Sequence, residues 1–408
     1  MSIFSSPQNT KYLFIDMNAY FASCEQQAHP LFRDKPVAVT PVNTPNGCIV
    51  SASYEAKKFG VKTGNLVKEA KALCPDIIVR ESDTFLYLEY HKKIVDVLES
   101  FSPFLSVKSI DEAVIKLSPS EQNSVRAHTF AAAIKEKIHF RLGRYMKSSV
   151  GIGPNIFLAK QASEYQKPDG LYEIKLENLE SYYLSQKLTD LKGINFRMER
   201  RFHEFGIFAP IDLFKCSNQE LKEKLGAMGE YWHLKLHGFD LTDASLAVPK
   251  SIGHSHVLAP RFRNWRSAWA VLQKLAEKAG RRLRRDHLEG GGVFLGIKFL
   301  NYGGYKRGMK TENFCDSITL SRLVNRLWQE FPKEDNLPLC VGLVLFNLVK
   351  PHSRQKRLFS SYEKQENLSL AMDAVNDKYG AFTIKPASIM NIEGSAPNRI
   401  AFGRPLED

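Results

Sequence analysis

The sequence is poor in cysteine, in uncharged apolar runs and, relative to its basic residues, in acidic residues. Its 408 residues include six cysteines that stand far apart. They lack the paired spacing of a zinc site or a disulfide framework, so we expect reduced thiols. No stretch of about 18 uncharged apolar residues occurs, which predicts that no helix spans a membrane. The first residues lack a basic segment followed by an apolar one, so we expect a cytoplasmic chain and not a secreted one.

Positive charge is in excess, and it is concentrated in one segment. The chain has 57 Lys and Arg against 44 Asp and Glu, a formal net charge of +13. Residues 250–310 alone hold 14 basic and three acidic residues, a local excess of +11. A surplus of this size usually serves to bind a polyanion, either nucleic acid or an anionic membrane surface. The polar, proline-containing stretch 241–250 ahead of this segment predicts a linker.

The first 175 residues alternate between strand-like and helix-like patterns. Apolar residues recur with a helical period in some stretches and form short continuous runs in others. The predicted helices cover 68–73, 85–101 and 126–142, and the predicted strands cover 12–15, 36–40, 49–51, 105–109, 113–117 and 149–152. This order predicts an α+β fold with helices packed on one side of a sheet.

Residues 188–206 predict two helices joined by a tight turn at Gly193. A helix-hairpin-helix module has this pattern, and its turn presents backbone N–H groups to a DNA phosphate. Asn195 stands where a second turn glycine is usual, and asparagine tolerates a left-handed backbone. An ordinary pair of antiparallel helices would give the same pattern, so both interpretations stay open.

Three carboxylates follow or interrupt predicted strands. Asp16 ends the apolar run YLFID, and Asp111 and Glu112 lie between two strand-like arms. Carboxylates beside buried strands are costly unless they are paired, hydrogen-bonded or bound to metal. On adjacent strand ends they could hold two Mg²⁺ ions for a phosphoryl-transfer reaction. Exposed acids at strand ends are the alternative.

Longer motifs surround these carboxylates and resemble those of one family. FIDMNAYFASCEQ, SASYEAKKFGVKTG, SIDEA, SVGIGPNIFLAKQASEYQKPDG and KSIGH occur in the order typical of Y-family DNA polymerases. The chain resembles the bacterial DinB/UmuC type of translesion polymerase from about residue 11 to about residue 360. The resemblance implies template-directed, low-fidelity DNA synthesis, with primer-template DNA and deoxynucleoside triphosphates as partners.

The resemblance also implies a right-hand architecture. The segments that match are 1–19 and 83–175 for the palm, 20–82 for the fingers, 176–240 for a helical thumb and 251–350 for a basic α/β little-finger domain, followed by a tail at 351–408.

By the same resemblance, Asp16, Asp111 and Glu112 match the ligands of two Mg²⁺ ions, with the Met17 carbonyl as a further ligand. Phe21 matches the steric gate that excludes a 2′-hydroxyl, with Tyr20 beside it. Asn18 stands where many members have Asp.

Basic residues match positions that contact the nucleotide and the DNA. Tyr54, Lys57 and Lys167 match triphosphate contacts. The family often has Arg at the position of Lys57, and the charge of a lysine is less directional than that of an arginine. Lys160 is expected to contact DNA, with an exposed helix-surface lysine as the alternative. Gly193 and Asn195 would contact a phosphate at the hairpin turn.

The cluster of Arg281, Arg282, Arg284 and Arg285 predicts a grip on the phosphate backbone without base readout, or else a solvated helix end. Downstream, Gln355, Leu358 and Phe359 resemble the peptide by which bacterial polymerases bind the sliding clamp. The alternative is that this apolar pair packs on its own domain. The tail predicts one helix whose apolar face carries Leu368, Ala371, Met372 and Val375.

Three functions compete on these observations. A polymerase needs all three carboxylates, and all three are present. A non-catalytic DNA-binding adaptor for the sliding clamp would be expected to lose one of them. A two-metal nuclease would have no use for Phe21 in the gate position. The motifs mix DinB-like and UmuC-like features, so a UmuD-like accessory protein stays open as a partner.

Overall fold

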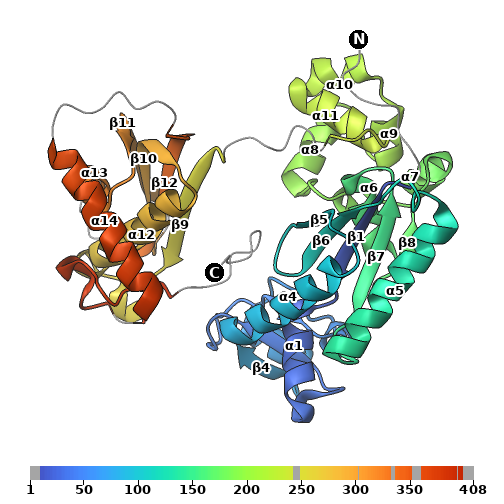
Figure 1. The fold of residues 1–408 in the computed structure, drawn as a ribbon, viewed down its shortest axis with the longest axis horizontal. Helices are drawn as coiled ribbons and strands as arrows, with labels where there is room; N and C mark the ends of the chain where they lie inside the picture. Colours follow the sequence, from blue (N-terminus) through green and yellow to red (C-terminus); the bar gives the residue numbers. More distant parts are fainter. Residues whose placement is uncertain are drawn as a thin grey trace. The chain divides into compact units, whose positions relative to one another are not determined.

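The computed structural model describes residues 10–241, 249–301, 303–331, 336–351, 360–392 and 394–397. The chain divides into two compact units, Met1–Ser245 with Arg399–Asp408, and Leu246–Asn398 (Figure 1). The predicted clamp residues Gln355, Leu358 and Phe359 lie outside the described residues, as does most of the predicted linker 241–250. Within the described ranges, no helix is long and apolar enough to cross a bilayer.

A five-stranded sheet forms the centre of the first unit, in the order β5-β6-β1-β7-β8. Its central strand β1 (Tyr12–Met17) is buried along its whole length and pairs antiparallel with β6 (Glu112–Lys116) and β7 (Ser148–Gly153). The strands β5 (Leu105–Val107) and β8 (Leu171–Glu173) form the edges. The predicted strands that correspond to β1, β5, β6 and β7 are therefore confirmed with small differences at their ends, whereas β8 was not predicted.

Helices cover both faces of this sheet. Because side chains alternate along a strand, Leu13 and Ile15 pack on α4 (Thr84–Glu99) and α5 (Ser124–Leu142). Tyr12 and Phe14 pack on the other side, against α6 (Ile156–Tyr165). The expectation of helices on one side only is wrong, because it left out α6, which begins where the Asn155 side chain accepts a hydrogen bond from the Leu158 N–H. The α+β class itself is confirmed.

Two smaller parts complete the first unit. The segment predicted as fingers holds the sheet β3 (Ser51–Ala52), β2 (Val37–Thr40) and β4 (Ile78–Glu81), with α1 (Tyr20–Ala28), α2 (Tyr54–Lys58) and α3 (Val67–Leu73). The segment 176–240 contains helices and no strands: α7 (Leu179–Leu184), α8 (Phe196–Glu204), α9 (Pro210–Lys215), α10 (Asn218–Leu225) and α11 (Ala227–Leu236), with short 3₁₀ turns.

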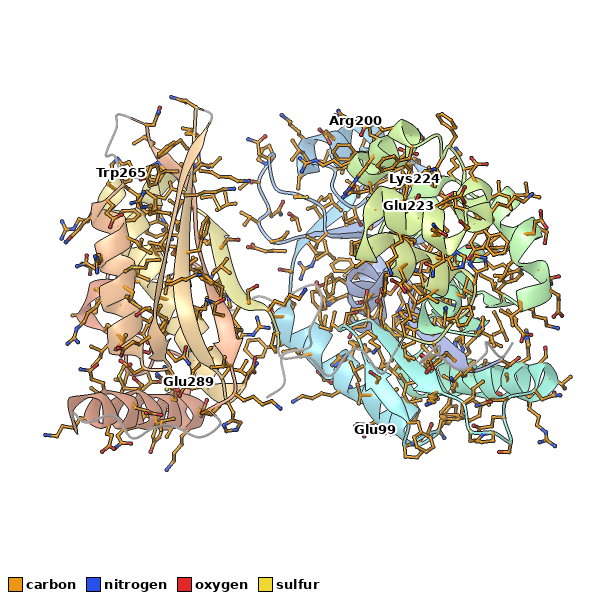
Figure 2. The ribbon with its side chains drawn as sticks, turned by 90° about the horizontal axis from the view of Figure 1, so that it is seen from above. Glu99, Arg200, Glu223, Lys224, Trp265 and Glu289 are labelled. Atoms are coloured by element: carbon orange, nitrogen blue, oxygen red, sulfur yellow. The ribbon has the colours of Figure 1, made fainter. Side chains whose placement is uncertain are left out.

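The second unit is a four-stranded antiparallel sheet with helices on one face. Its order is β11 (Gly304–Phe314), β10 (Glu289–Phe299), β12 (Pro338–Val349) and β9 (Ser251–Val257). The helices α12 (Trp265–Arg285) and α13 (Ser317–Gln329) bury their apolar sides against it. Trp265, labelled in Figure 2, packs edge-on against Trp328 with ring centroids 5.6 Å apart.

The opposite face of this sheet is rich in glycine. A Cβ atom at Gly292 would lie 2.3 Å from the ring of Phe346, and one at Gly308 would lie 2.7 Å from the ring of Phe294. Both positions therefore require glycine, because an aromatic ring from the neighbouring strand lies over each backbone.

The tail helix α14 (Ser360–Tyr379) packs on the second unit, beside α13 and α12 (Figure 1). The predicted helix is confirmed, but its predicted apolar face is only partly correct, because Met372 and Val375 are half-buried whereas Leu368 and Ala371 are exposed. Leu368 is 51% exposed, whereas the buried positions include Ser369 and Asn376. A polar stripe faces inward because it bonds to α12 and α13, for example through Ser369 Oγ, which accepts a hydrogen bond from the Ser317 N–H at 3.1 Å.

Candidate active site

Strand pairing brings two of the predicted metal ligands together. In the register of β1 and β6, Asp16 lies directly opposite Glu112. Both residues share the strand face of Phe14 and Val114, which is the face covered by α6. Asp16 is 4% exposed, so its carboxylate requires partners that compensate for lost hydration.

Two lysines from the α6 region supply those partners. Lys160 Nζ lies 2.5 Å from Asp16 Oδ2 and 2.6 Å from Glu112 Oε1, and Lys167 Nζ lies 2.8 Å from Asp16 Oδ1. Burial alone would lower the pKa of Lys160, but the carboxylates of Asp16, Glu112 and Glu164 raise it above its usual value. Lys160 was predicted to contact DNA. Its ammonium group instead lies inside the carboxylate cluster, because α6 faces the same side of the sheet as Asp16.

Asp111 lies just before β6 and is turned differently. Its carboxylate accepts a hydrogen bond of 2.5 Å from the Ser109 hydroxyl, and its main-chain carbonyl accepts one from the Met17 N–H. Burial raises the pKa of Asp111, and the nearby charges of Asp16 and Glu112 raise it further. Asp111 is thus electrostatically coupled to the other two carboxylates, although its side chain is hydrogen-bonded elsewhere.

The donor set fits a hard divalent ion. Within the described part of the chain, no three acidic, histidine or cysteine side chains already converge on one point. The ammonium of Lys160 lies between Asp16 and Glu112, where a cation is stabilised by two carboxylates. Carboxylate and carbonyl oxygens are the ligands that Mg²⁺ prefers. Asp16, Asp111 and Glu112 could hold such ions, and the Met17 carbonyl stays a predicted further ligand.

Glu164, which was not predicted as a site residue, joins the lysines to one another. Its Oε1 lies 3.2 Å from Lys160 Nζ, 3.1 Å from Lys167 Nζ and 3.1 Å from Lys192 Nζ. Burial would raise the pKa of Glu164, but these three ammonium groups lower it to about 2. The available signal was its spacing, four residues after Lys160 and three before Lys167.

The predicted triphosphate contacts gather beside this cluster. Tyr54 and Lys57 lie on α2, where the Lys57 Nζ is 4.2 Å from the centroid of the Tyr54 ring. Burial, and then the charges of Asp16 and Glu164, raise the pKa of Tyr54 to about 12. Burial lowers the pKa of Lys57, and the like charge of Lys167 lowers it further. Tyr54 and Lys57 thus lie within electrostatic reach of Asp16 and Glu164, and Lys167 forms ion pairs with both carboxylates.

Phe21 lies at the start of α1, next to the end of β1. Between them Ala19 has a left-handed backbone with φ 46°, which turns the chain sharply after Asp16 and Met17. The Phe21 ring stacks on Tyr87 with centroids 4.6 Å apart, and the Tyr20 hydroxyl donates a hydrogen bond to the Tyr87 carbonyl at 2.7 Å. The ring is therefore fixed in place, as a gate that acts by exclusion requires.

The predicted hairpin turn exists, with one difference. Gly193 takes the left-handed region at φ 102°, but Asn195 has an extended backbone at φ −103°. Asn195 does not use the left-handed conformation that asparagine tolerates, because this residue caps α8. Its Oδ1 accepts hydrogen bonds from the N–H groups of Arg197 and Met198.

An unexpected lysine lies beneath this turn. Lys235 is 7% exposed, and its Nζ lies 3.2 Å from the centroid of the Trp232 ring and 4.4 Å from that of Phe157. No carboxylate among the described residues forms an ion pair with it. Burial lowers the pKa of Lys235 to about 7.

The arginine cluster on α12 divides into two kinds of residue. Arg284 has a side chain only 5% exposed, and it forms two hydrogen bonds to Asp373 of α14, at 2.6 and 2.9 Å. Arg281 pairs with Asp377 of the same helix. The prediction that Arg284 grips DNA is wrong, because its guanidinium is buried against the tail helix. Arg282 and Arg285 lie near Asp286, with N–O distances of 3.7 Å.

Other basic residues of this unit lie on the glycine-rich face of the sheet. Lys298, Lys306 and Lys310 are exposed. The pairs Gly292–Lys310 and Gly296–Lys306 place two of these lysines beside glycines of β10. The sequence analysis counted these lysines in the basic segment but did not single them out.

Comparison with known proteins agrees with this arrangement. A family model described as impB/mucB/samB matches residues 15–164, and the model of its C-terminal domain matches residues 249–358. The chain is 32% identical over 396 residues to the DNA polymerase IV of Pelotomaculum thermopropionicum, covering 94% of this chain and 97% of that protein. It is 31% identical over 385 residues to the DNA polymerase IV of Moorella thermoacetica, covering 92% and 95%.

The chain belongs to the Y family of translesion DNA polymerases. Solved structures of this family share its fold. The Y-family chimera of Dbh and Dpo4 aligns with a TM-score of 0.68 at 22% identity, over 83% of this chain and 99% of the other. An insertion ternary complex of Dbh DNA polymerase aligns with a TM-score of 0.56 at the same identity and coverage. The α+β right-hand fold expected from the motifs is therefore confirmed.

Proposed function

We propose that this Y-family enzyme extends a primer on template DNA by Mg²⁺-dependent nucleotidyl transfer at Asp16, Asp111 and Glu112. The observation that carries the proposal is the direct pairing of Asp16 with Glu112, with the Asp111 carbonyl hydrogen-bonded to the N–H of Met17, the residue after Asp16. Two Mg²⁺ ions held there would activate the primer hydroxyl and stabilise the triphosphate leaving group. The identity of the metal as Mg²⁺, the number of two ions and the role of the Met17 carbonyl as a further ligand are all parts of this proposal.

Residues around the carboxylates would position the incoming nucleotide. Lys57 and Lys167 are suited to the triphosphate, because each lysine offers a charged donor beside the carboxylate cluster. Tyr54 would add a hydroxyl donor from the start of α2. Phe21, held between Tyr20 and Tyr87, would leave no space for a 2′-hydroxyl and so select deoxynucleotides.

The duplex would be held without base readout. The backbone at Gly193 and Asn195 and the exposed lysines Lys298, Lys306 and Lys310 offer donors for phosphates. Arg282 and Arg285, which lie near Asp286, are the members of the arginine cluster that we propose for this role. Phosphate contacts of this kind carry no sequence information, which suits an enzyme that moves along any template. Since its substrate is DNA, we expect the enzyme in the cytoplasm, the compartment of the chromosome in its bacterial relatives.

The clamp-binding peptide at Gln355, Leu358 and Phe359 stays part of the proposal, on its sequence alone. It falls between β12, which ends at Val349, and α14, which begins at Ser360, so both flanking elements belong to the second unit. Relatives over nearly the whole chain carry the name DNA polymerase IV. We therefore expect the chain to work without a UmuD-like accessory protein.

Primer extension by the purified full chain tests this function. We expect Mg²⁺-dependent synthesis on undamaged templates, synthesis past at least one blocking lesion, and none after chelation. The non-catalytic adaptor would bind the same DNA but would add no nucleotide under any metal condition, and that result would contradict the proposal.

A further inference from the structure

Both carboxylate oxygens of Asp16 are occupied by ammonium groups. Lys167 Nζ lies 2.8 Å from Oδ1, and Lys160 Nζ lies 2.5 Å from Oδ2. Lys160 also lies 2.6 Å from Glu112 Oε1, so its ammonium bridges the two paired strands. A metal ion bound jointly by Asp16 and Glu112 would need the position that this ammonium fills.

We infer that Lys160 and Lys167 are internal counter-cations that exclude divalent ions from the carboxylates until a triphosphate draws the ammonium groups away. The inference rests on the proposed metal-dependent function. An ammonium and a divalent ion on the same carboxylate oxygens would repel each other strongly at this buried site. Binding of the ion therefore requires at least one lysine to leave, and departure without a new partner would strand a half-buried charge.

Glu164 is an alternative ion-pair partner for both lysines. Its Oε1 lies 3.2 Å from Lys160 Nζ and 3.1 Å from Lys167 Nζ, so a small side-chain movement transfers each ammonium from Asp16 to Glu164. Lys192 completes this group at 3.1 Å. Glu164 thus acts as a positioning residue. It contacts neither the carboxylate ligands nor the position of the ion, but it determines how strongly the lysines hold Asp16.

A triphosphate would change this balance. Burial lowers the pKa of Lys57, and the like charge of Lys167 lowers it further, so the two ammonium groups lie close enough to repel each other. A polyphosphate anion would relieve that repulsion and attract Lys167 away from Asp16. Nucleotide and metal binding are then positively coupled, since each binds better when the other is present. Free ions in the cell would be held poorly by the enzyme without nucleotide.

Binding of Mn²⁺ to the full chain, without nucleotide or DNA, tests the inference. Electron paramagnetic resonance measures the free ion directly and needs no activity. Lys160→Met should tighten Mn²⁺ binding by about tenfold or more, because it removes the competing ammonium. Glu164→Gln should weaken it, because both lysines then have only Asp16 and Glu112 as partners. Lys93→Met, which removes an exposed lysine paired with Glu89 on α4, is the matched control and should change nothing.

Opposite effects of the two variants cannot arise from a general loss of structure. Lys160→Gln repeats the first test with a polar side chain, in case Lys160→Met folds poorly. Mn²⁺ affinity at or below the wild-type value in both Lys160 variants, with primer extension by the wild type intact, overturns the inference and leaves the proposed function standing. Mn²⁺ binding that is unchanged by Asp16→Asn, together with no primer extension, would instead contradict the proposed metal site itself, and the inference with it.

Discussion

The side chain of Asn18 holds the loop that carries Lys167. Its Oδ1 accepts a hydrogen bond from the Asp169 N–H at 2.7 Å, and its Nδ2 donates one to Ser149 Oγ at 3.0 Å. Asn18 is 2% exposed, so both bonds are shielded from water. The residue that differs from the usual family pattern therefore has a structural task. It links the end of β1 to the segment that brings an ammonium to Asp16.

Asn18→Ala should loosen that loop. Loss of the buried partner for the Asp169 N–H should cost about 1–3 kcal/mol of stability, and the KM for nucleotides should rise more than kcat falls. Asn18→Asp keeps the acceptor and should lie closer to wild type. Asn123→Ala, which removes the cap of α5, should cost about 1 kcal/mol without any effect on nucleotide use. Equal KM values in Asn18→Ala and wild type would remove Asn18 from this role.

Phe21→Ala should admit ribonucleotides. The ring acts by exclusion, so its removal should reduce discrimination against the 2′-hydroxyl by about tenfold or more, while deoxynucleotide use falls less. Phe21 is 7% exposed and stacks on Tyr87, so Phe21→Leu serves as a variant that keeps more of the packing. Tyr87→Phe keeps both rings and should keep the discrimination. Single-nucleotide incorporation kinetics decide; unchanged selectivity in both Phe21 variants would assign the gate to another residue, with Tyr20 the next to test.

Arg284 should act on stability and not on DNA affinity. Arg284→Met removes a buried guanidinium that bonds Asp373, the Cys315 carbonyl and Ser317 Oγ. The loss should be about 3 kcal/mol in urea unfolding, with the salt dependence of DNA binding unchanged. Arg285 has a side chain that is 48% exposed. Arg285→Ala should leave the stability unchanged and should flatten the slope of log K for DNA binding against log salt by about 0.9. If Arg284→Met were as stable as wild type and its DNA binding depended less on salt, Arg284 would contact DNA after all.

Lys235 should make stability depend on pH above neutrality. Its pKa is lowered by burial from 10.5 to about 7. Below pH 7 both the folded and the unfolded forms carry the proton, so the full cost of the buried charge is present. Between pH 7 and 10.5 the unfolded chain binds more protons, and the free energy of unfolding should rise with pH. Lys235→Met should be more stable than wild type at pH 7 and should lose most of this rise.

The control for that change is Lys222→Met, at a lysine 61% exposed and paired with Glu230. It should leave the pH profile of unfolding as in wild type. A profile in Lys235→Met that still rises like the wild type would show that the Lys235 ammonium is solvated in the folded state.

Local patterns in the sequence predicted much of the first unit. The apolar run YLFID and the strand-like arms around Asp111 and Glu112 predicted β1 and β6, and the helical period predicted α4 and α5. The family resemblance of the motifs, and not their spacing alone, placed Asp16, Asp111 and Glu112 in one site. The position of Lys160 was not predictable in this way. It depends on which face of the sheet α6 covers, and a short helix whose apolar residues suit either face does not reveal that.

Contacts between distant segments account for the other differences. Arg284 and Asp373 are 89 residues apart, and nothing local to RRLRR reveals that two of its arginines meet acidic residues of the tail. Ser369 of α14 is buried although it is polar, because it bonds to Ser317 of α13, and a rule that buries apolar residues does not select its side of the helix. Glu164 was missed because its partners come from both its own helix and Lys192, beyond the next strand.

The central claim is that Asp16, Asp111 and Glu112 carry out metal-dependent primer extension. Asp111→Asn tests it most directly. Asp111 makes no ion pair with Lys160 or Lys167 in the described structure, and the substitution keeps the shape of the side chain. Mg²⁺-dependent extension and binding to the same primer-template DNA should be measured together, with the exposed Asp76→Asn as control. We predict loss of extension in Asp111→Asn with DNA affinity near wild type, and normal extension in Asp76→Asn. Extension by Asp111→Asn at the wild-type rate would contradict the account.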